Sequence, residues 1–178
     1  MTSFSSSEML AYWRRALGFD TSRPDCDISI YEGIDVDGII RVRMRQWYLR
    51  QLDTALPCMV NHEDVASRCS MAPSKHVADA ALITLPADAR RPMSVKLSGW
   101  EVPAPVVTPS EAAQRIKRMA SPFGRPGCCD PLALKTEAGI EVYPARGTLQ
   151  SLRAVVDPGE DLYILDEFLL ETIPNSLS

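Results

Sequence analysis

The stretch that decides the fold runs from residue 81 to residue 97 and reads ALITLPADARRPMSVKL. Residues 81–85 form a short apolar run that ends at a proline, and residues 93–97 alternate between apolar and polar side chains. Alternation with a period of two is typical of a half-buried strand. Residues 87–92, between the two runs, predict a turn. The stretch therefore predicts two strands in succession. It also marks the point where the helical patterns of the sequence give way to strand patterns.

The chain after this stretch is rich in proline and predicts short strands. Eleven of the 14 prolines lie from Pro86 onward, and proline is excluded from helix interiors and from central strands. Residues 132–134 and 140–143 flank a turn and predict a hairpin, and residues 149–156 predict a further strand. The segment 102–106, which reads VPAPV, suits the edge of a sheet or an extended arm.

Two helices are predicted within this second half. Residues 108–111, TPSE, place Thr at the cap, Pro at the first helical position and Glu at the third, and the helix ends before Pro122. Residues 157–160, DPGE, also resemble a helix start. The apolar residues expected on the inner face of that last helix are Leu162, Leu165, Phe168 and Leu169.

The chain before residue 81 predicts two amphipathic helices. Ser5 and Glu8 have the spacing of a capping box, and Gly18 is placed to end the first helix. A longer helix is expected from residue 35 to residue 56, closed by Pro57. Its apolar stripe consists of Ile40, Met44, Trp47, Tyr48, Leu52 and Leu56.

Helices and strands are segregated along the chain, which predicts an α+β fold rather than a parallel α/β sheet. We expect N-terminal helices followed by a proline-rich antiparallel β region with one short inserted helix. Residues 28–31 alternate and predict an extended segment, while residues 61–72 predict a loop or a short helical turn. The expected division is a helical segment, residues 1–60, and a β-rich segment, residues 61–178, which together form one structural unit.

The bulk composition indicates a folded protein of a reducing compartment. The 178 residues are 46% hydrophobic with a net charge of -4, a balance that argues against a whole-protein nucleic-acid binder. The first five residues have neither a basic start nor an apolar run, so no secretory signal is expected. The chain has five cysteines, an odd number, and we expect no disulfide framework. No apolar stretch approaches the roughly 20 residues of a membrane helix.

One group of side chains has the chemistry of a zinc site. Cys58, His62, Cys69 and His76 lie close together in the sequence and combine thiol with imidazole. The spacing lacks the close pair of cysteines found in common zinc fingers and ribbons. Two half-buried thiols and two surface histidines are the alternative. A cysteine nucleophile, Cys58 or Cys69 with His76, is a further alternative that no flanking motif supports.

Three other patterns have ordinary structural explanations. Cys128 and Cys129 are adjacent, as in a strained redox disulfide, yet such pairs mostly serve as small apolar residues in a loop. Asp35 and Asp37 hint at a calcium loop, but the flanking positions are wrong for one, and a helix start explains the pair. The arginines of the second helix do not share one face, which predicts solvated flanks or ion pairs with a neighbouring subunit; they are Arg41, Arg43, Arg45 and Arg50.

The apolar helix faces and prolyl strands suggest that this chain works inside an assembly. A short amphipathic helix is marginal alone and needs a partner surface. Tryptophan is enriched at interface hot spots, so Trp13, Trp47 and Trp100 are candidate anchors. Burial of these side chains in the core of the same chain is the alternative.

Several short pieces resemble those of the head-to-tail connector, or portal-adaptor, ring proteins of tailed bacteriophages. The resemblance spans most of the chain. The pieces are residues 35–40 leading into 45–48, residues 85–88 leading into 94–97, residues 121–126 and residues 140–144. A long C-terminal tail that would reach into the portal is not evident in the sequence, so the head-side or tail-side position stays open.

The resemblance implies a non-catalytic structural subunit of the virion, made in the host cytoplasm. Its partners would be copies of itself in a ring, usually twelvefold, together with the portal and other tail proteins. Nucleic acid would only pass through the ring, and no membrane, metal, cofactor or catalytic residue is expected. The alternatives are a small cytoplasmic metal-binding or regulatory domain that uses the Cys/His group, and a small hydrolase with a cysteine nucleophile.

Overall fold

The computed structural model describes residues 1–18, 30–31, 34–74 and 79–173. The chain divides into two compact units: unit 1 comprises Met1–Asn61 and Val156–Ser178, and unit 2 comprises His62–Val155. Unit 2 is therefore an insertion within unit 1. The sequence placed residues 156–178 with the β-rich segment, whereas in the structure they pack with the N-terminal residues.

In its described residues, unit 1 contains two α-helices, two two-stranded sheets and two 3-10 helices. The capping box predicted at its first helix is present: Glu8 N donates to Ser5 Oγ at 3.3 Å, and Ser5 N donates to Glu8 Oε2 at 2.7 Å. Asp35 caps the second helix by accepting from Gly38 N at 2.8 Å. The elements are β1 (Thr2–Ser5), α1 (Ser6–Ala16), β2 (Ile30–Tyr31), β3 (Ile34–Asp35), α2 (Val36–Thr54), η1 (Pro57–Met59), β12 (Leu162–Leu165) and η4 (Glu167–Thr172).

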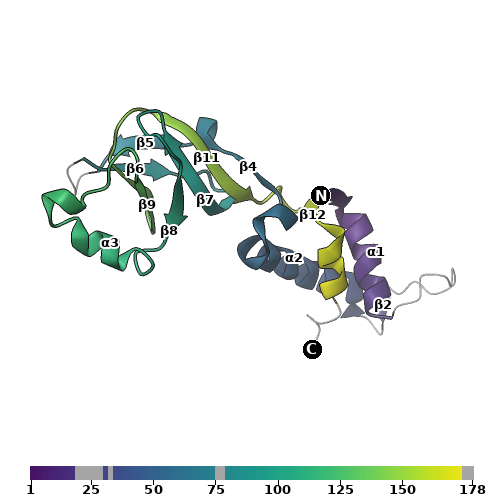
Figure 1. Ribbon diagram of the computed structural model, residues 1–178. Helices are drawn as coiled ribbons and strands as arrows, with labels where there is room; N and C mark the ends of the chain where they lie inside the picture. Colours follow the sequence, from purple (N-terminus) through teal and green to yellow (C-terminus); the bar gives the residue numbers. More distant parts are fainter. Residues whose placement is uncertain (19–29, 32–33, 75–78, 174–178) are drawn as a thin grey trace. The chain divides into compact units, whose positions relative to one another are not determined.

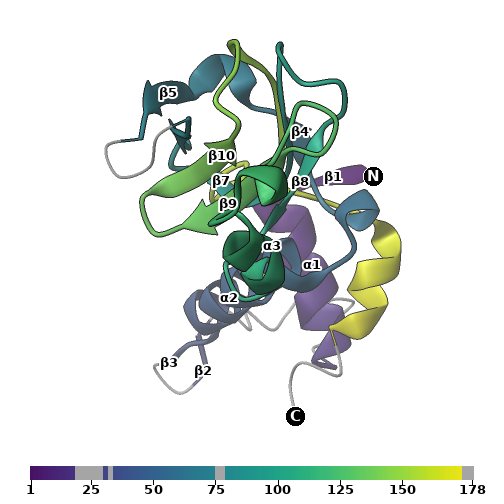
Figure 2. The same cartoon turned by 60° about the vertical axis from the view of Figure 1, so that its left-hand side comes forward.

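The helices α1 and α2 lie side by side and enclose the core of unit 1 (Figures 1 and 2). Trp13 of α1 packs edge-to-face on Trp47 of α2, with ring centroids 6.0 Å apart. Tyr48 packs in the same way on Tyr163, at 4.8 Å. The predicted apolar stripe of α2 is buried except for Leu56, which lies beyond the end of the helix and is 65% exposed.

The C-terminal part of unit 1 is a strand where the sequence predicted a helix. Residues 162–165 form β12, which pairs antiparallel with β1 in the register Thr2↔Leu165 to Ser5↔Leu162. The helix prediction failed because the apolar residues of this segment fit a helical spacing and a strand about equally well, and tertiary pairing decides between them. Phe168, predicted on an inner face, is 64% exposed on the 3-10 helix η4.

Unit 2 is built on a curled eight-stranded sheet (Figure 1). Its strand order is β4-β11-β7-β8-β9-β10-β6-β5. The strands are β4 (His62–Asp64), β5 (Ser70–Pro73), β6 (Ala81–Thr84), β7 (Ala89–Leu97), β8 (Ala104–Val107), β9 (Leu132–Thr136), β10 (Gly139–Tyr143) and β11 (Leu149–Val156). The predicted turn at 87–92 is shorter than expected, because β7 already begins at Ala89.

The segment between residues 61 and 72 was predicted as a loop or a short helical turn; a helical turn is present, but the two strands that flank it were missed. The segment forms β4 and β5, the two edge strands of the sheet, with the 3-10 helix η2 (Ala66–Arg68) between them. Both strands are short and mostly exposed. A short edge strand buries too few side chains to give an alternating pattern, so the sequence carries little signal for it.

Strand β8 was expected at a sheet edge and lies inside the sheet instead. It pairs antiparallel with β7 through residues 104–105 and parallel with β9 through residues 106–107. Pro105 has no backbone N–H to donate to a neighbouring strand. It is tolerated there because pairing with β9 starts only at the next residue, Val106. The helix α3 (Ala113–Arg118) supplies the long connection that a parallel pair requires. The β region is therefore mixed rather than wholly antiparallel.

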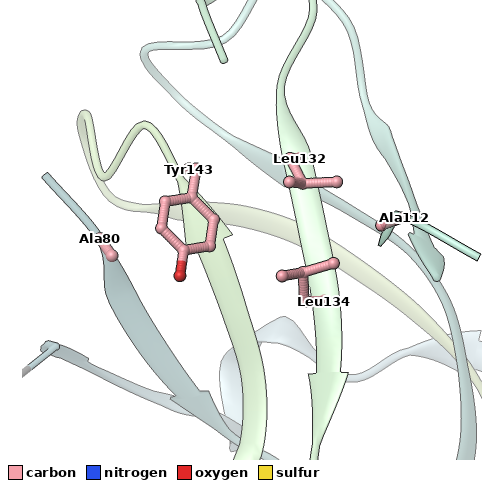
Figure 3. Close-up of a cluster of buried hydrophobic side chains, with 5 residues drawn as sticks. All are labelled: Ala80, Ala112, Leu132, Leu134 and Tyr143. Atoms are coloured by element: carbon pink, nitrogen blue, oxygen red, sulfur yellow. The ribbon is translucent and has the colours of Figure 1, made fainter. Parts of the chain in front are cut away.

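The hairpin β9–β10 was predicted correctly, and it forms part of the core of unit 2. Gly139 pairs with Thr136 at its turn. Leu132 and Leu134 of β9 and Tyr143 of β10 form one buried cluster with two alanines from neighbouring segments (Figure 3). The packing of strands with few helices confirms the α+β class.

Candidate interaction surfaces

The candidate zinc residues are not brought together in the part of the chain that the structure describes. Cys58 is exposed on η1 in unit 1, whereas His62 on β4 and Cys69 after η2 belong to unit 2. His76 lies outside the described residues. Among residues 1–18, 30–31, 34–74 and 79–173, no group of three or more His, Cys, Asp or Glu side chains is arranged to hold a metal ion.

Two of the described cysteines, Cys69 and Cys129, have a raised pKa. Burial raises the pKa of Cys69, although the neighbouring Arg68 acts in the opposite direction. A hydrogen bond with the Glu101 side chain raises the pKa of Cys129. A raised pKa keeps a thiol protonated at neutral pH and lowers its nucleophilicity. The adjacent Cys128 and Cys129 are both free, so the vicinal disulfide is not formed in this structure.

The acidic pair Asp35 and Asp37 stabilises the start of α2. This is the helix start that was predicted as the alternative to a calcium loop. Asp35 is the N-cap. Asp37 forms a two-pronged ion pair with Arg14 of α1, in which Arg14 Nε donates to Asp37 Oδ1 at 2.9 Å. Arg45 of α2 likewise pairs within unit 1, with Asp157 at 2.5 Å. Arg45 therefore forms an ion pair within its own chain, and not with a neighbouring subunit.

The three tryptophans are core residues, which contradicts their assignment as interface anchors. Trp13, Trp47 and Trp100 are only 1%, 3% and 3% exposed. Trp100 also donates a hydrogen bond from its indole N–H to the carbonyl of Pro144 at 2.8 Å. The size of tryptophan makes it equally valuable in a core and at an interface, and the sequence contains no signal that separates the two uses.

The two units carry opposite net charge. Residues 62–155 contain 12 Lys and Arg against 9 Asp and Glu, and the remaining residues contain 7 against 14. Unit 2 is thus net positive and unit 1 strongly net negative, while the whole chain has a charge of only -4. The net charge of the whole chain does not reveal this difference between the units, because it can be calculated only when the boundaries of the inserted unit are known.

The basic side chains of unit 2 gather around an exposed phenylalanine. We call residues 113–130 the Phe123 arm; it consists of α3, the 3-10 helix η3 (Pro122–Gly124) and the turn that follows. Phe123 is 100% exposed. Arg115, Arg118 and Arg125 line a small hollow of about 210 Å³ beside it.

The shape of the Phe123 arm is fixed by contacts of its backbone. Arg115 pairs with Asp130 at 2.8 Å and donates to the carbonyl oxygens of Asp130 and Pro131. Gly124 lies so close to α3 that a Cβ there would be 2.2 Å from the carbonyl oxygen of Arg118. Neither Arg118 nor Arg125 pairs with a carboxylate among the described residues, and both are exposed. Two guanidinium groups next to Phe123 are thus available to a partner.

Unit 1 contains a groove lined by acidic and apolar side chains, which we call the acidic groove. Its volume is about 660 Å³. Two exposed aromatic side chains line the groove, Tyr12 of α1 and Phe168 of η4. The guanidinium carbon of Arg15 lies over the Tyr12 ring, 5.7 Å from its centroid. The carboxylates that line the groove are Asp166, Glu167 and Glu171.

Two of the groove carboxylates have a structural partner, and one has none among the described residues. Asp166 caps η4 by accepting from Phe168 N at 3.0 Å. Glu167 accepts from the hydroxyl of Thr2 at 3.1 Å. The groove was missed because it depends on η4 lying beside α1, two elements at opposite ends of the chain.

The sequence matches no protein-family model and no curated protein. No helix in the described part of the chain is both long enough and apolar enough to cross a membrane.

Proposed function

We propose that this chain is a non-catalytic structural subunit of a tailed-phage virion, which forms a connector or adaptor ring between the head portal and the tail. The observation that supports this most is the presence of two unlike surfaces on one chain, the basic Phe123 arm and the acidic groove. Unlike surfaces that meet head to tail generate a ring when the rotation closes.

The resembling pieces of sequence support the same proposal. Residues 121–126 are one of these pieces, and they include the fully exposed Phe123 of the arm. Residues 94–97 lie in β7 and residues 140–143 in β10, both within the sheet of unit 2. In this proposal the sheet provides a rigid support, and the arm provides a subunit contact. The portal and other tail proteins would bind further surfaces of the ring, in a virion assembled in the host cytoplasm.

Native mass spectrometry with metal analysis on the same sample tests the proposal. The expected result at micromolar concentration is a single closed oligomer whose mass is a multiple of 19.7 kDa, without bound metal. A sharply monodisperse monomer would contradict the proposal. Stoichiometric zinc, lost together with the fold on chelation, would instead support the metal-binding alternative with Cys58, His62, Cys69 and His76.

A further inference from the structure

We infer that the Phe123 arm of one copy docks into the acidic groove of the next copy. This inference deepens the proposed ring function and rests on it. It assigns one specific contact: the Phe123 ring lies against Tyr12 and Phe168 of the groove, and the guanidinium groups of Arg118 and Arg125 meet the carboxylates of Glu167 and Glu171.

The sizes of the two features identify which is the insert and which is the receptor. Sites that enclose a ligand are typically about 300–1,000 Å³ in volume. The acidic groove, at about 660 Å³, falls in this range, whereas the hollow on the arm, at about 210 Å³, does not. Phe123 projects fully into solvent. A fully exposed aromatic side chain that is flanked by arginines has the composition of an interface anchor.

The charges of the two features are complementary. The arm hollow is lined by three arginines and one aspartate, and the groove by three carboxylates and one arginine. The same relation holds for the units as wholes, since unit 2 is net positive and unit 1 net negative. Charge complementarity of this kind guides association and excludes contacts between two like surfaces. Arm-to-arm and groove-to-groove pairing are therefore disfavoured, which leaves the head-to-tail arrangement.

The acidic groove favours a second copy over nucleic acid as the occupant of the arm. Duplex phosphates need only the arginines, and single-stranded bases can stack on Phe123, but nucleic acid of either kind leaves the carboxylates of the groove without a partner. A second copy gives each feature a partner: Phe123 meets Tyr12 and Phe168, and the arginines meet carboxylates. Each copy then supplies one arm and one groove, so that a closed ring leaves neither feature uncovered.

The test uses two full-length charge-reversal variants and their mixture. The arm variant carries Arg118→Glu and Arg125→Glu, and the groove variant carries Glu167→Lys and Glu171→Lys. Arg115 is left in place because it bonds to the backbone of the arm. We expect each variant alone to need at least tenfold more protein for assembly, because arm and groove then carry the same charge.

Mixing the two variants in equal amounts should restore assembly, in rings with an even number of alternating copies. The reversed arm fits the reversed groove, and the natural arm of the second variant fits the natural groove of the first. A matched control carries Lys135→Glu and Arg153→Glu, the same charge change on exposed β-strand positions of unit 2. It should assemble like the natural protein. Phe123→Ser, which leaves the charge unchanged, should also weaken assembly at least tenfold.

The possible outcomes separate this inference from the proposed function. If the natural protein forms a ring and all variants form it equally well, the arm–groove contact is wrong while the ring function stands. If each variant fails but the mixture does not recover, the two features do not meet between copies, and the inference is again wrong. Loss of binding to double-stranded DNA by the arm variant, with assembly unchanged, would assign the arm to nucleic acid. If the natural protein stays monomeric, the proposed function itself is wrong.

Discussion

Gly139 is a residue at which both backbone conformation and space require glycine. Its φ is +140°, and a Cβ at this position would lie 2.2 Å from the carbonyl oxygen of Ile83 on the neighbouring strand β6. The turn between β9 and β10 can therefore stay tight against β6 only without a side chain. The sequence predicted the hairpin, but the neighbouring strand that makes this glycine necessary could not be read from it.

We predict that Gly139→Ala lowers the free energy of unfolding by at least about 2 kcal/mol, because strain at positive φ costs about 1–3 kcal/mol and the clash adds to it. Urea denaturation followed by circular dichroism measures the change. Gly127→Ala is the matched control, since no heavy atom lies within 4 Å of a Cβ there. It should change stability by less than about 0.5 kcal/mol. Equal effects at the two positions would show that the contact with β6 is not important.

At the scale of elements, the capping boxes were the most predictable features of the chain. Those at Ser5 and Thr108 were recognised from sequence, and both sets of hydrogen bonds are present. The box at Ser5 starts α1, whereas the helix predicted to begin at Thr108 begins only at Ala113, after a turn. The helix start predicted at residues 157–160 is wrong. Capping-box signals are local, because a cap bonds to residues only three positions away. Strands β4, β5 and β12 were missed for the opposite reason, since their existence depends on partners that are distant in sequence. The two interaction surfaces depend on the same long-range contacts.

We predict that Ser5→Ala lowers the free energy of unfolding of the chain by about 1 kcal/mol through the loss of the α1 cap. The backbone and side-chain hydrogen bonds from Ser5 hold the pKa of Glu8 below its ordinary value of 4.5. A lowered pKa in the folded state stabilises the fold above pH 4.5, and this contribution is lost as the pH falls below that value. The difference between the natural protein and Glu8→Gln should therefore shrink on acidification.

Denaturation curves at pH 7 and pH 3.5 for both proteins measure this dependence. Ser7→Ala is a suitable control for the cap, because Ser7 makes only a hydroxyl contact with Ser5. A pH dependence that is unchanged by Glu8→Gln would contradict the role of this carboxylate.

At the scale of the whole molecule, the insertion of unit 2 into unit 1 is the main organising feature. The chain passes between the units at residues 61–62 and 155–156. These positions are paired: His62 lies opposite Val155 in the β4–β11 ladder, and Val156 N donates to the carbonyl of Asn61 at 3.0 Å. The ends of unit 2 are therefore held together by its own sheet. This arrangement could not be predicted from the sequence, because the two halves of unit 1 have no common pattern.

We predict that a fragment of residues 62–155 folds on its own, because it contains a complete sheet and the buried cluster around Leu132, Leu134 and Tyr143. Its size lies within the range of independently folding domains. The expected result is a dispersed amide NMR spectrum and a cooperative thermal transition. A collapsed spectrum with no cooperative transition would show that unit 2 needs unit 1 in order to fold.

The pairing of β1 with β12 also affects how the protein is made. Thr2 lies opposite Leu165, so β1 can pair with β12 only after all the residues between them have been synthesised. At about 5–20 residues per second, the delay is roughly 10–30 s, whereas unit 2 is contiguous and can fold during this time. The N-terminal strand must stay unpaired for that whole interval. Its length of only four residues limits the chance that it pairs with a neighbouring nascent chain.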